Sequence, residues 1–469
     1  MLFCVMNALG ELAVAFPVSG GFATYASRFM DPAWGFSMGW NYALQWIICL
    51  PLEIVAASLT IGYWRPDLNP AIFVSVFLVL IVAINMCGTE AYANAEVAFS
   101  FVKCVAIIGF IIFGLAVDLG ASQSTGYIGA RYWLNPGPFN NGFKGLCSVM
   151  VNAAFAFSGT ELIGLTAAET DNPRKTLPAA IKQVFWRICL FYLGSLTVVG
   201  LILPFDFPGL VPSDESKADG HSPNASPYVL AVVNAGVTAL PAIMNAAILL
   251  AVISVANSSV FGGSRTLVGL AEQAQAPKIF AYVDRKGRPL AALGATLSVG
   301  LLAYLACMSD RGANIFQWLL AFSGLSAVFT WLSICVCHIR FRTAWRKRGH
   351  STDELSFISR TDVWGSYFGV AANVFILGAQ FWVAVRPIGY ESYTPSEIAQ
   401  EFFQAYLCVP LMIIMYVVWK VLKRSKIMRS HTIDLQTGRS QFDEEKLMAE
   451  EKAERETWGP FKRVWRFLC

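Results

Sequence analysis

Residues 36–61 read FSMGWNYALQWIICLPLEIVAASLTI, an apolar stretch whose single charged side chain is that of Glu53. About 20 consecutive apolar residues form a helix long enough to cross a hydrocarbon core roughly 30 Å thick. Ten other stretches have the same character, and the loops between them carry most of the charge. The sequence therefore predicts an all-α membrane protein with eleven spans, at about 1–18, 36–61, 71–87, 97–117, 145–166, 187–204, 240–261, 291–308, 315–338, 364–385 and 402–422.

The composition excludes a soluble globular protein. Of the 469 residues, 56% are hydrophobic and only 14% are charged, whereas a soluble domain carries about 25% charged residues. Most of the 35 lysines and arginines lie in alternate loops and in the tail, which the positive-inside rule assigns to the cytoplasm. We therefore expect one membrane domain over residues 1–422, with its amino terminus outside, and a cytoplasmic tail over residues 423–469. The net charge of +4 reflects this asymmetry and indicates no nucleic-acid partner.

Four charged side chains inside the predicted spans are of interest, namely those of Glu11, Glu53, Lys103 and Glu161. Such residues are costly in lipid and usually functional. Glu11 lies near the inner end of its span, where its carboxylate can reach the interface. Lys103 can extend its ammonium group to water, or it can pair with a carboxylate of the same bundle. Because unpaired burial costs several kcal/mol for each group, we predict paired or protonated groups, with proton-coupling roles for Lys103, Glu161 and Glu53.

The stretch FAFSGTE at residues 155–161 places three poor helix formers in succession at membrane depth. One explanation is a close helix contact through small residues. The other is a broken helix whose free carbonyl and amide groups bind a zwitterion, as in transporters with discontinuous helices. Glu161, directly after the small residues, favours the broken helix. We therefore predict a substrate site formed by Phe155, Ala156, Phe157, Ser158, Gly159 and Thr160.

The histidines and cysteines argue against an enzyme or a metal site. Nearly all eleven cysteines lie inside spans or at their ends, where Cys behaves as a small hydrophobe. The four histidines are scattered among loops and one span end. We therefore expect no catalytic residues, no metal and no cofactor.

The loops and the carboxyl terminus carry three weaker signals. The inner loop 262–290 is amphipathic and predicts a short helix lying on the inner face. In the outer loop, Asn224 begins a glycosylation sequon, although the adjacent Pro227 should lower its use. Cys469 follows aromatic and basic residues and is predicted to be palmitoylated. A free terminal thiol is the alternative.

Several blocks occur in order along the chain: ELAVAFPVSGG at 11–21, LPLEIVAAS at 50–58, FSGTE at 157–161, AE at 168–169, NPRKTLP at 172–178, KQVFWR at 182–187, CHIRFR at 337–342 and DELSF at 353–357. Together they resemble the amino acid–polyamine–organocation transporters, and within them the fungal amino-acid permeases of the general type. The resemblance covers essentially the whole chain, including the tail.

This resemblance implies the leucine-transporter fold, in which two inverted five-helix repeats hold the substrate near the midplane. The first predicted span matches the family's second helix, and the span at 145–166 matches its sixth. The carbonyls of residues 156–160 would then hold the amino group of an amino acid, with Phe155 as an aromatic gate over it.

The resemblance also assigns the coupling residues. Lys103 matches a lysine of the family's fifth helix that resembles a stand-in for a sodium ion in proton-driven members. Residues 257–259 (NSS) match the eighth helix, where sodium-coupled relatives bind their ion. In this chain they are expected to face the surroundings of that lysine.

One departure from the family pattern concerns the beginning of the chain. The family's first helix, which binds the substrate carboxylate through its glycine break, has no counterpart in the sequence. We therefore expect eleven of the family's twelve transmembrane helices and an internal start or incomplete gene model at Met1. Without that helix the chain is expected not to transport, an expectation that uptake by the chain expressed from Met1 would contradict.

The resulting hypothesis is a symporter that carries L-amino acids and protons into the cell across the plasma membrane. Its partners would be the lipid bilayer and, through the carboxyl-terminal tail, ubiquitin-ligase adaptors. Lysine and arginine permeases have a Gln before the glycine, whereas Ser158 precedes Gly159 here, which favours a broad or neutral range. The alternatives are a non-transporting amino-acid sensor on the same scaffold and an inactive truncated permease.

Overall fold

A computed structural model describes residues 1–439 apart from 19, 123–125, 136, 167–172, 208–209, 211–225 and 308–311. The described part of the chain is helical and contains no β-strand. Its helices are α1 (Leu2–Ala15), α2 (Gly21–Phe29), α3 (Pro32–Ile61), α4 (Pro70–Met86), α5 (Thr89–Ala116), η1 (Val117–Ala121), α6 (Arg131–Leu134), α7 (Gly142–Ser148), α8 (Met150–Phe157), α9 (Leu162–Thr166), α10 (Pro173–Arg187), η3 (Ile188–Leu193), α11 (Gly194–Ile202), α13 (Pro227–Asn234), α14 (Leu240–Glu272), η4 (Lys278–Ala281), α15 (Leu290–Val299), η5 (Gly300–Cys307), α16 (Gly312–Lys347), η6 (Thr352–Glu354), α17 (Asp362–Val385), η7 (Tyr390–Ser392), α18 (Pro395–Tyr406) and α19 (Cys408–Lys423).

The number of apolar helices agrees with the sequence. Within the described residues, eight helical segments are long and apolar enough to cross a membrane. The pair α18 and α19 adds a ninth span bent by 56°, and α1 and α4 are shorter apolar helices. This set is consistent with the eleven spans expected.

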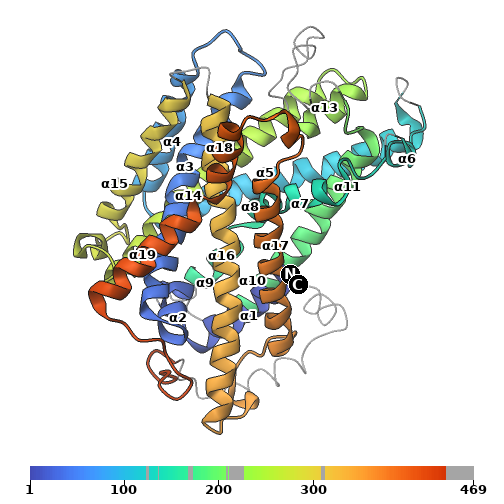
Figure 1. The fold of residues 1–469 in the computed structure, drawn as a ribbon. Coiled ribbons are helices and arrows are strands. Elements are labelled where there is room, and N and C mark those ends of the chain that lie inside the picture. Colours follow the sequence, from blue (N-terminus) through green and yellow to red (C-terminus); the bar gives the residue numbers. More distant parts are fainter. Residues whose placement is uncertain are drawn as a thin grey trace, which may run out of the picture.

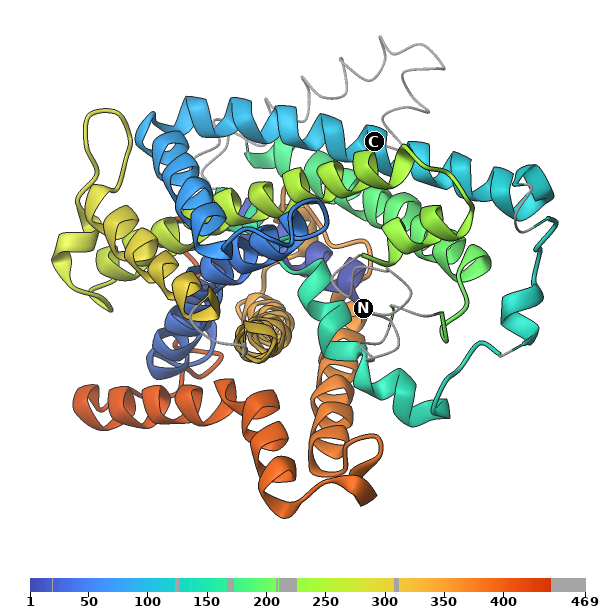
Figure 2. The same cartoon turned by 90° about the horizontal axis from the view of Figure 1, so that it is seen from above.

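The long helix α3 lies at the centre of the bundle and packs against α14, α16, α2 and α19 (Figure 1). It begins sharply because Pro32 occupies its first turn and the Asp31 carboxylate accepts a hydrogen bond from the amide of Ala33 at 2.9 Å. Seen from above, α16 is viewed nearly end-on while α5 runs almost lengthwise (Figure 2). The helices of the bundle are therefore strongly inclined to one another.

Small residues allow α3 and α14 to approach closely. A Cβ atom on Gly262 would lie 2.9 Å from the Trp46 ring, and one on Gly263 would lie 3.2 Å from Ile47. Such contacts are the usual means of joining helices in a membrane. The expectation of a separate helix on the inner face at 262–290 was wrong. Residues 262–272 instead continue α14 into the bundle. Only the short η4 follows in that loop.

The first part of the tail is docked against the carboxyl-terminal ends of α2 and α16. Ile433 and Leu435 are buried in the main core cluster with Phe341 and Trp345. Three arginines hold the backbone of this segment by donating to its carbonyls. Arg28 donates to Thr437 at 2.8 Å, Arg340 to Met428, and Arg348 to Ile433. The charged stretch 441–457, Cys469, Asn224 and residues 168–172 lie outside the described residues.

Candidate functional site

The fifth expected span is interrupted at residues 158–161. Helix α8 ends at Phe157, Ser158 adopts an extended conformation, and α9 begins at Leu162. Gly159 has φ = +93°, and a Cβ atom there would lie 3.1 Å from Cη2 of Trp46 on α3. The backbone turns here because glycine alone adopts this conformation easily and leaves room for the indole.

Side chains of the break satisfy the carbonyls that the helix leaves open. The Ser158 hydroxyl donates to the carbonyl of Phe155 at 2.7 Å, and the Thr160 hydroxyl donates to that of Phe157 at 3.2 Å. From η3, the Tyr192 hydroxyl donates to the carbonyl of Ala156 at 3.0 Å. Each of these three carbonyls thus accepts from a hydroxyl. A hydroxyl can rotate away, and an ammonium group can then donate to the carbonyl instead.

Glu161 is fully buried and stabilises the break. Its carboxylate accepts from the amide of Gly159 at 3.0 Å and from the indole Nε1 of Trp331 on α16 at 3.1 Å. Its donors are neutral groups, so the carboxylate links the break to α16 without an ion pair among the described residues.

The three residues predicted to couple protons lie in three separate environments. Glu161 is at the break, and Glu53 is buried on α3, where the Cys49 thiol lies 3.9 Å from its carboxylate. Lys103 on α5 donates from Nζ to the hydroxyl of Ser254 on α14 at 2.9 Å. The mutual pairing considered for these groups is therefore not what the structure shows.

Sequence reasoning missed Glu96, the carboxylate to which Lys103 is connected. The Ser254 hydroxyl links the two side chains, since it accepts from Lys103 and donates to Oε2 of Glu96 at 2.7 Å. Asn257 donates to Oε1 of Glu96 at 3.1 Å and in turn accepts from Asn85 on α4 at 2.9 Å. We call Lys103, Ser254, Glu96, Asn257 and Asn85 the α5–α14 network.

Glu96 was missed because the expected span began at residue 97, whereas α5 begins at Thr89. A signal was nevertheless present in the sequence. Glu96 precedes Lys103 by seven residues, which is two helical turns and therefore the same face. Asn257 does lie near the lysine, as the resemblance implied.

The expectation for Glu11 was wrong. Its carboxylate does not reach the interface but is fully buried. It lies 2.9 Å from Nη2 of Arg342, 3.0 Å from Nε2 of His338 and 2.7 Å from the amide of Ser359. The reason is that α16 extends to Lys347, beyond the expected end at residue 338, and so carries Arg342 into the bundle.

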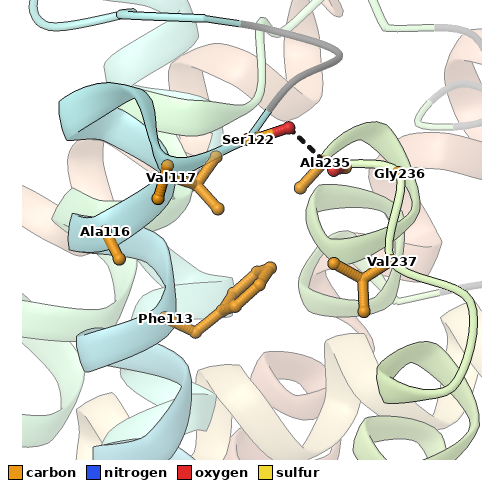
Figure 3. A pocket seen from close by; sticks show the side chains of 8 residues that line it. Phe113, Ala116, Val117, Ser122, Ala235, Gly236 and Val237 are labelled. Carbon is orange, nitrogen blue, oxygen red and sulfur yellow. Dashed lines mark hydrogen bonds between the residues drawn. The ribbon is translucent and has the colours of Figure 1, made fainter.

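A cavity of about 400 Å³ lies elsewhere, between the carboxyl-terminal end of α5 and the connection from α13 to α14 (Figure 3). Phe113 and Val117 face Val237 across it, and the Ser122 hydroxyl donates to the carbonyl of Ala235 at 2.9 Å. Its lining residues carry no charge. We take the break as the candidate site because its carbonyls are held by hydroxyls and a buried carboxylate lies beside them, whereas no charged side chain lines this cavity.

Comparison with known proteins decides the family. The family model described as amino acid permease matches residues 1–432. The chain belongs to the amino acid permease family. It is therefore a multi-pass membrane permease of a family that transports amino acids, and not an enzyme.

This permease is similar to fungal general amino-acid permeases. It is 50% identical to the general amino-acid permease GAP2 of Candida albicans, matching all of this chain and 79% of that protein. It is 47% identical to the general amino-acid permease GAP1 of Saccharomyces cerevisiae, matching all of this chain and 78% of that protein.

A solved structure shows the same fold at low identity. The manganese transporter of Eremococcus coleocola superposes with a TM-score of 0.51 and 15% identity, over 90% of this chain and 85% of that one. The expected fold class, a helical membrane bundle of the leucine-transporter type, is thereby confirmed.

Proposed function

We propose that this permease is a plasma-membrane symporter that brings L-amino acids into the cell together with protons. The observation that carries the proposal is the hydrogen-bonded chain from Lys103 through Ser254 to Glu96. It joins a cation on α5 to a carboxylate through a hydroxyl of α14, the helix that packs most extensively on α3. Family membership supplies the amino acid as substrate.

The amino acid would bind at the break. Its ammonium group can replace the hydroxyls of Ser158 and Thr160 at the carbonyls of Phe155 and Phe157. Phe155 itself is only partly buried and packs on the core cluster, where it can cover the substrate. Among the described residues, the carboxylate at the break is that of Glu161, which accepts from Gly159 and Trp331 and so holds the break itself together. Ser158 precedes Gly159 where lysine and arginine permeases have a Gln, which favours neutral amino acids or a broad range.

The proton would act on the α5–α14 network. When Glu96 is ionised, its carboxylate accepts from Ser254, whose oxygen then accepts from Lys103. Protonation of Glu96 would remove the negative charge that orients these hydrogen bonds. The ammonium group of Lys103 would then lose the favourable charge on the other side of Ser254. The packing of α5 on α14 thus depends on the proton, and Glu53 and Glu161 are the other carboxyls that can take one up in the bundle.

Uptake into proteoliposomes tests both parts of the proposal, with labelled L-leucine as the substrate. An inward proton gradient should make the parent protein accumulate leucine. Lys103→Met should abolish accumulation while leaving leucine exchange at equal pH in place, because exchange requires no net proton movement. Lys278→Met, an exposed lysine of the α14–α15 loop, is the matched control and should behave as the parent.

Three outcomes would overturn the proposal. Accumulation that ignores the proton gradient would exclude proton coupling, and normal accumulation by Lys103→Met would exclude its role. Leucine binding without any exchange or uptake would identify a sensor on this scaffold.

A further inference from the structure

We infer that Tyr192 recognises the carboxylate of the substrate, and that an amino acid binds by placing its two charged ends between the Tyr192 hydroxyl and the carbonyl of Ala156. This inference rests on the proposed binding of an amino acid at the break. In the structure the phenol donates directly to this carbonyl at 3.0 Å. On binding, the ammonium group of the ligand becomes the donor to Ala156, and the carboxylate of the ligand becomes the acceptor for Tyr192.

The carbonyl of Ala156 is the most open acceptor at the end of α8. The neighbouring carbonyl of Phe155 accepts from both the amide and the hydroxyl of Ser158, at 3.0 and 2.7 Å. Helix α8 ends at Phe157, and within the described part of the chain the Tyr192 hydroxyl is the donor to Ala156. A carbonyl oxygen offers two lone pairs, so this acceptor is available to a ligand as soon as the phenol leaves.

Tyr192 differs from the other hydroxyls of the break in the element that carries it. Ser158 and Thr160 donate to carbonyls three residues earlier in their own segment. Tyr192 lies on η3, which packs against α10 and α11. Because its hydroxyl comes from another helix, a ligand can lie between it and the carbonyl and contact both. A donor of the same turn does not allow this.

Two local features of η3 suit Tyr192 to this role. η3 is a π-helical turn between α10 and α11, and such turns are rare and frequently lie at functional sites. The Tyr192 side chain is 38% exposed, and its ring contacts that of Phe157 with centroids 5.0 Å apart. A side chain with this exposure can leave the carbonyl without opening the core of the bundle.

The exchange of partners is favourable for a zwitterion. One neutral hydrogen bond is replaced by two charge-assisted ones, each roughly twice as strong. Neither the phenol nor the carbonyl is left without a partner, which would otherwise cost the desolvation of that group. The Glu161 carboxylate beside Gly159 favours the ammonium end of the ligand at the break, which leaves the carboxylate end for the phenol of η3.

A ligand without a carboxylate tests this role. Isoamylamine is leucine without its carboxyl group, so it keeps the ammonium group and the side chain. Labelled L-leucine binding to the purified full chain gives the leucine affinity, and displacement of leucine gives that of isoamylamine. Tyr192→Phe should weaken leucine binding by about tenfold, equal to about 1.4 kcal/mol. Isoamylamine should bind to this variant at least as tightly as to the parent protein, because it no longer competes with the phenol for Ala156.

Tyr228→Phe is the matched control. The Tyr228 hydroxyl on α13 contacts that of Ser195 on α11 at 2.9 Å and makes no contact with the break among the described residues. This variant should bind both ligands as the parent does. Where leucine binding is too weak for displacement, protection against thermal unfolding by isoamylamine gives its affinity instead.

The outcomes separate this inference from the proposed function. A parent protein that binds no leucine would overturn both. If the parent binds leucine, equal weakening of leucine and isoamylamine by Tyr192→Phe would show a merely structural hydrogen bond and overturn the inference alone. Tighter binding of both ligands would show that the phenol only competes with the ammonium group, and it would overturn carboxylate recognition. A Tyr192→Phe protein indistinguishable from Tyr228→Phe would do the same.

Discussion

Two carboxylates at membrane depth, Glu11 and Glu96, are held in opposite ways. Glu11 is fully buried and directly contacts Arg342, His338 and the amide of Ser359. Among the described residues, Glu96 accepts from the neutral groups of Ser254 and Asn257, and Lys103 lies beyond the Ser254 hydroxyl. Removing one partner of a direct buried pair leaves an uncompensated charge, whereas a carboxylate held by neutral donors can be protonated at smaller cost. Contacts, and not depth, distinguish the carboxylate that fixes helices together from the one that we propose carries a proton.

The largest expected effect is on the Glu11 side of the comparison. Arg342→Met should destabilise the protein by about 3–5 kcal/mol, because it strands a buried carboxylate. Thermal unfolding in detergent and the yield of folded protein measure this loss. Arg346→Met, an exposed arginine one turn further along α16, should be close to neutral. Equal stability of the two variants would show that the Glu11 cluster is not a structural ion pair.

The Glu96 side predicts the opposite pattern. Glu96→Gln keeps a hydrogen-bond acceptor for Ser254 but cannot be ionised, so the protein should stay folded. Gradient-driven leucine accumulation should fall by about a hundredfold, in the range typical of a lost proton-transfer group. The decisive measurement is the ratio of accumulation to exchange in the same liposomes. A variant that loses stability and keeps coupling would reverse the assignment of the two carboxylates.

Glu161 provides an intermediate case, because it is fully buried like Glu11 but accepts from neutral donors like Glu96. Gly159→Ala tests the turn that positions it. An alanine at φ = +93° is strained and meets Trp46, so the cost should be about 1–2 kcal/mol. Gly109→Ala on α5 meets no atom within 4 Å and is the control. Thermal unfolding that does not distinguish the two variants would contradict a tight break.

The smallest expected effect concerns an exposed carboxylate of the tail, Asp434. Hydrogen bonds from Thr437 and from the backbone amides of Gln436 and Thr437, with the charge of Arg28, lower its pKa to about 2. A depressed pKa stabilises the docked tail above the ordinary value near 4, and the contribution is lost only as pH falls through about 2. Protease cleavage of the tail should therefore be constant between about pH 5 and 8.

Asp434→Asn measures the size of this contribution. Because the group is largely exposed, solvent screening limits the loss to less than about 1 kcal/mol, which corresponds to a few-fold faster cleavage. Asp353→Asn, an exposed aspartate between α16 and α17, is the control. A cleavage rate that rises steeply between pH 8 and 5 would show that a different group controls docking.

The fold and part of the site followed from the sequence because apolar length and misplaced polar residues are local signals. Lys103, Glu53, Glu161 and the break at Ser158–Thr160 were recognisable as exceptions in apolar stretches. Their partners were not, because pairing depends on which helices meet. Nothing in the sequence distinguishes Ser254 from other residues of α14, because its role depends on Lys103 and Glu96 lying beside it in the fold.

Errors arose where helices pass the membrane boundary. Hydropathy ends a span where charge begins, so Glu96 and Arg342 were assigned to loops although α5 and α16 continue through them. Hydropathy also ended the expected span at residue 261 and so separated residues 262–272 from α14. Hydropathy does not show that Gly262 and Gly263 pack on α3. The ends of long helices, where polar residues enter the bundle, are thus where a single sequence is least informative.

The docking of the tail has a consequence for how this segment can vary. Arg28, Arg340 and Arg348 donate to main-chain oxygens, which every residue type provides. The contacts of the three arginines therefore depend on the spacing of these carbonyls and not on the side chains of the residues that supply them. Ile433 and Leu435 are buried on either side of the exposed Asp434, so inserting one residue after Ser425 would turn the apolar side chains outward and shift every carbonyl away from its arginine. Docking of the tail thus depends on the number of residues between α19 and the buried Ile433 and Leu435. Two tails with little sequence in common can dock in the same way if they keep that number.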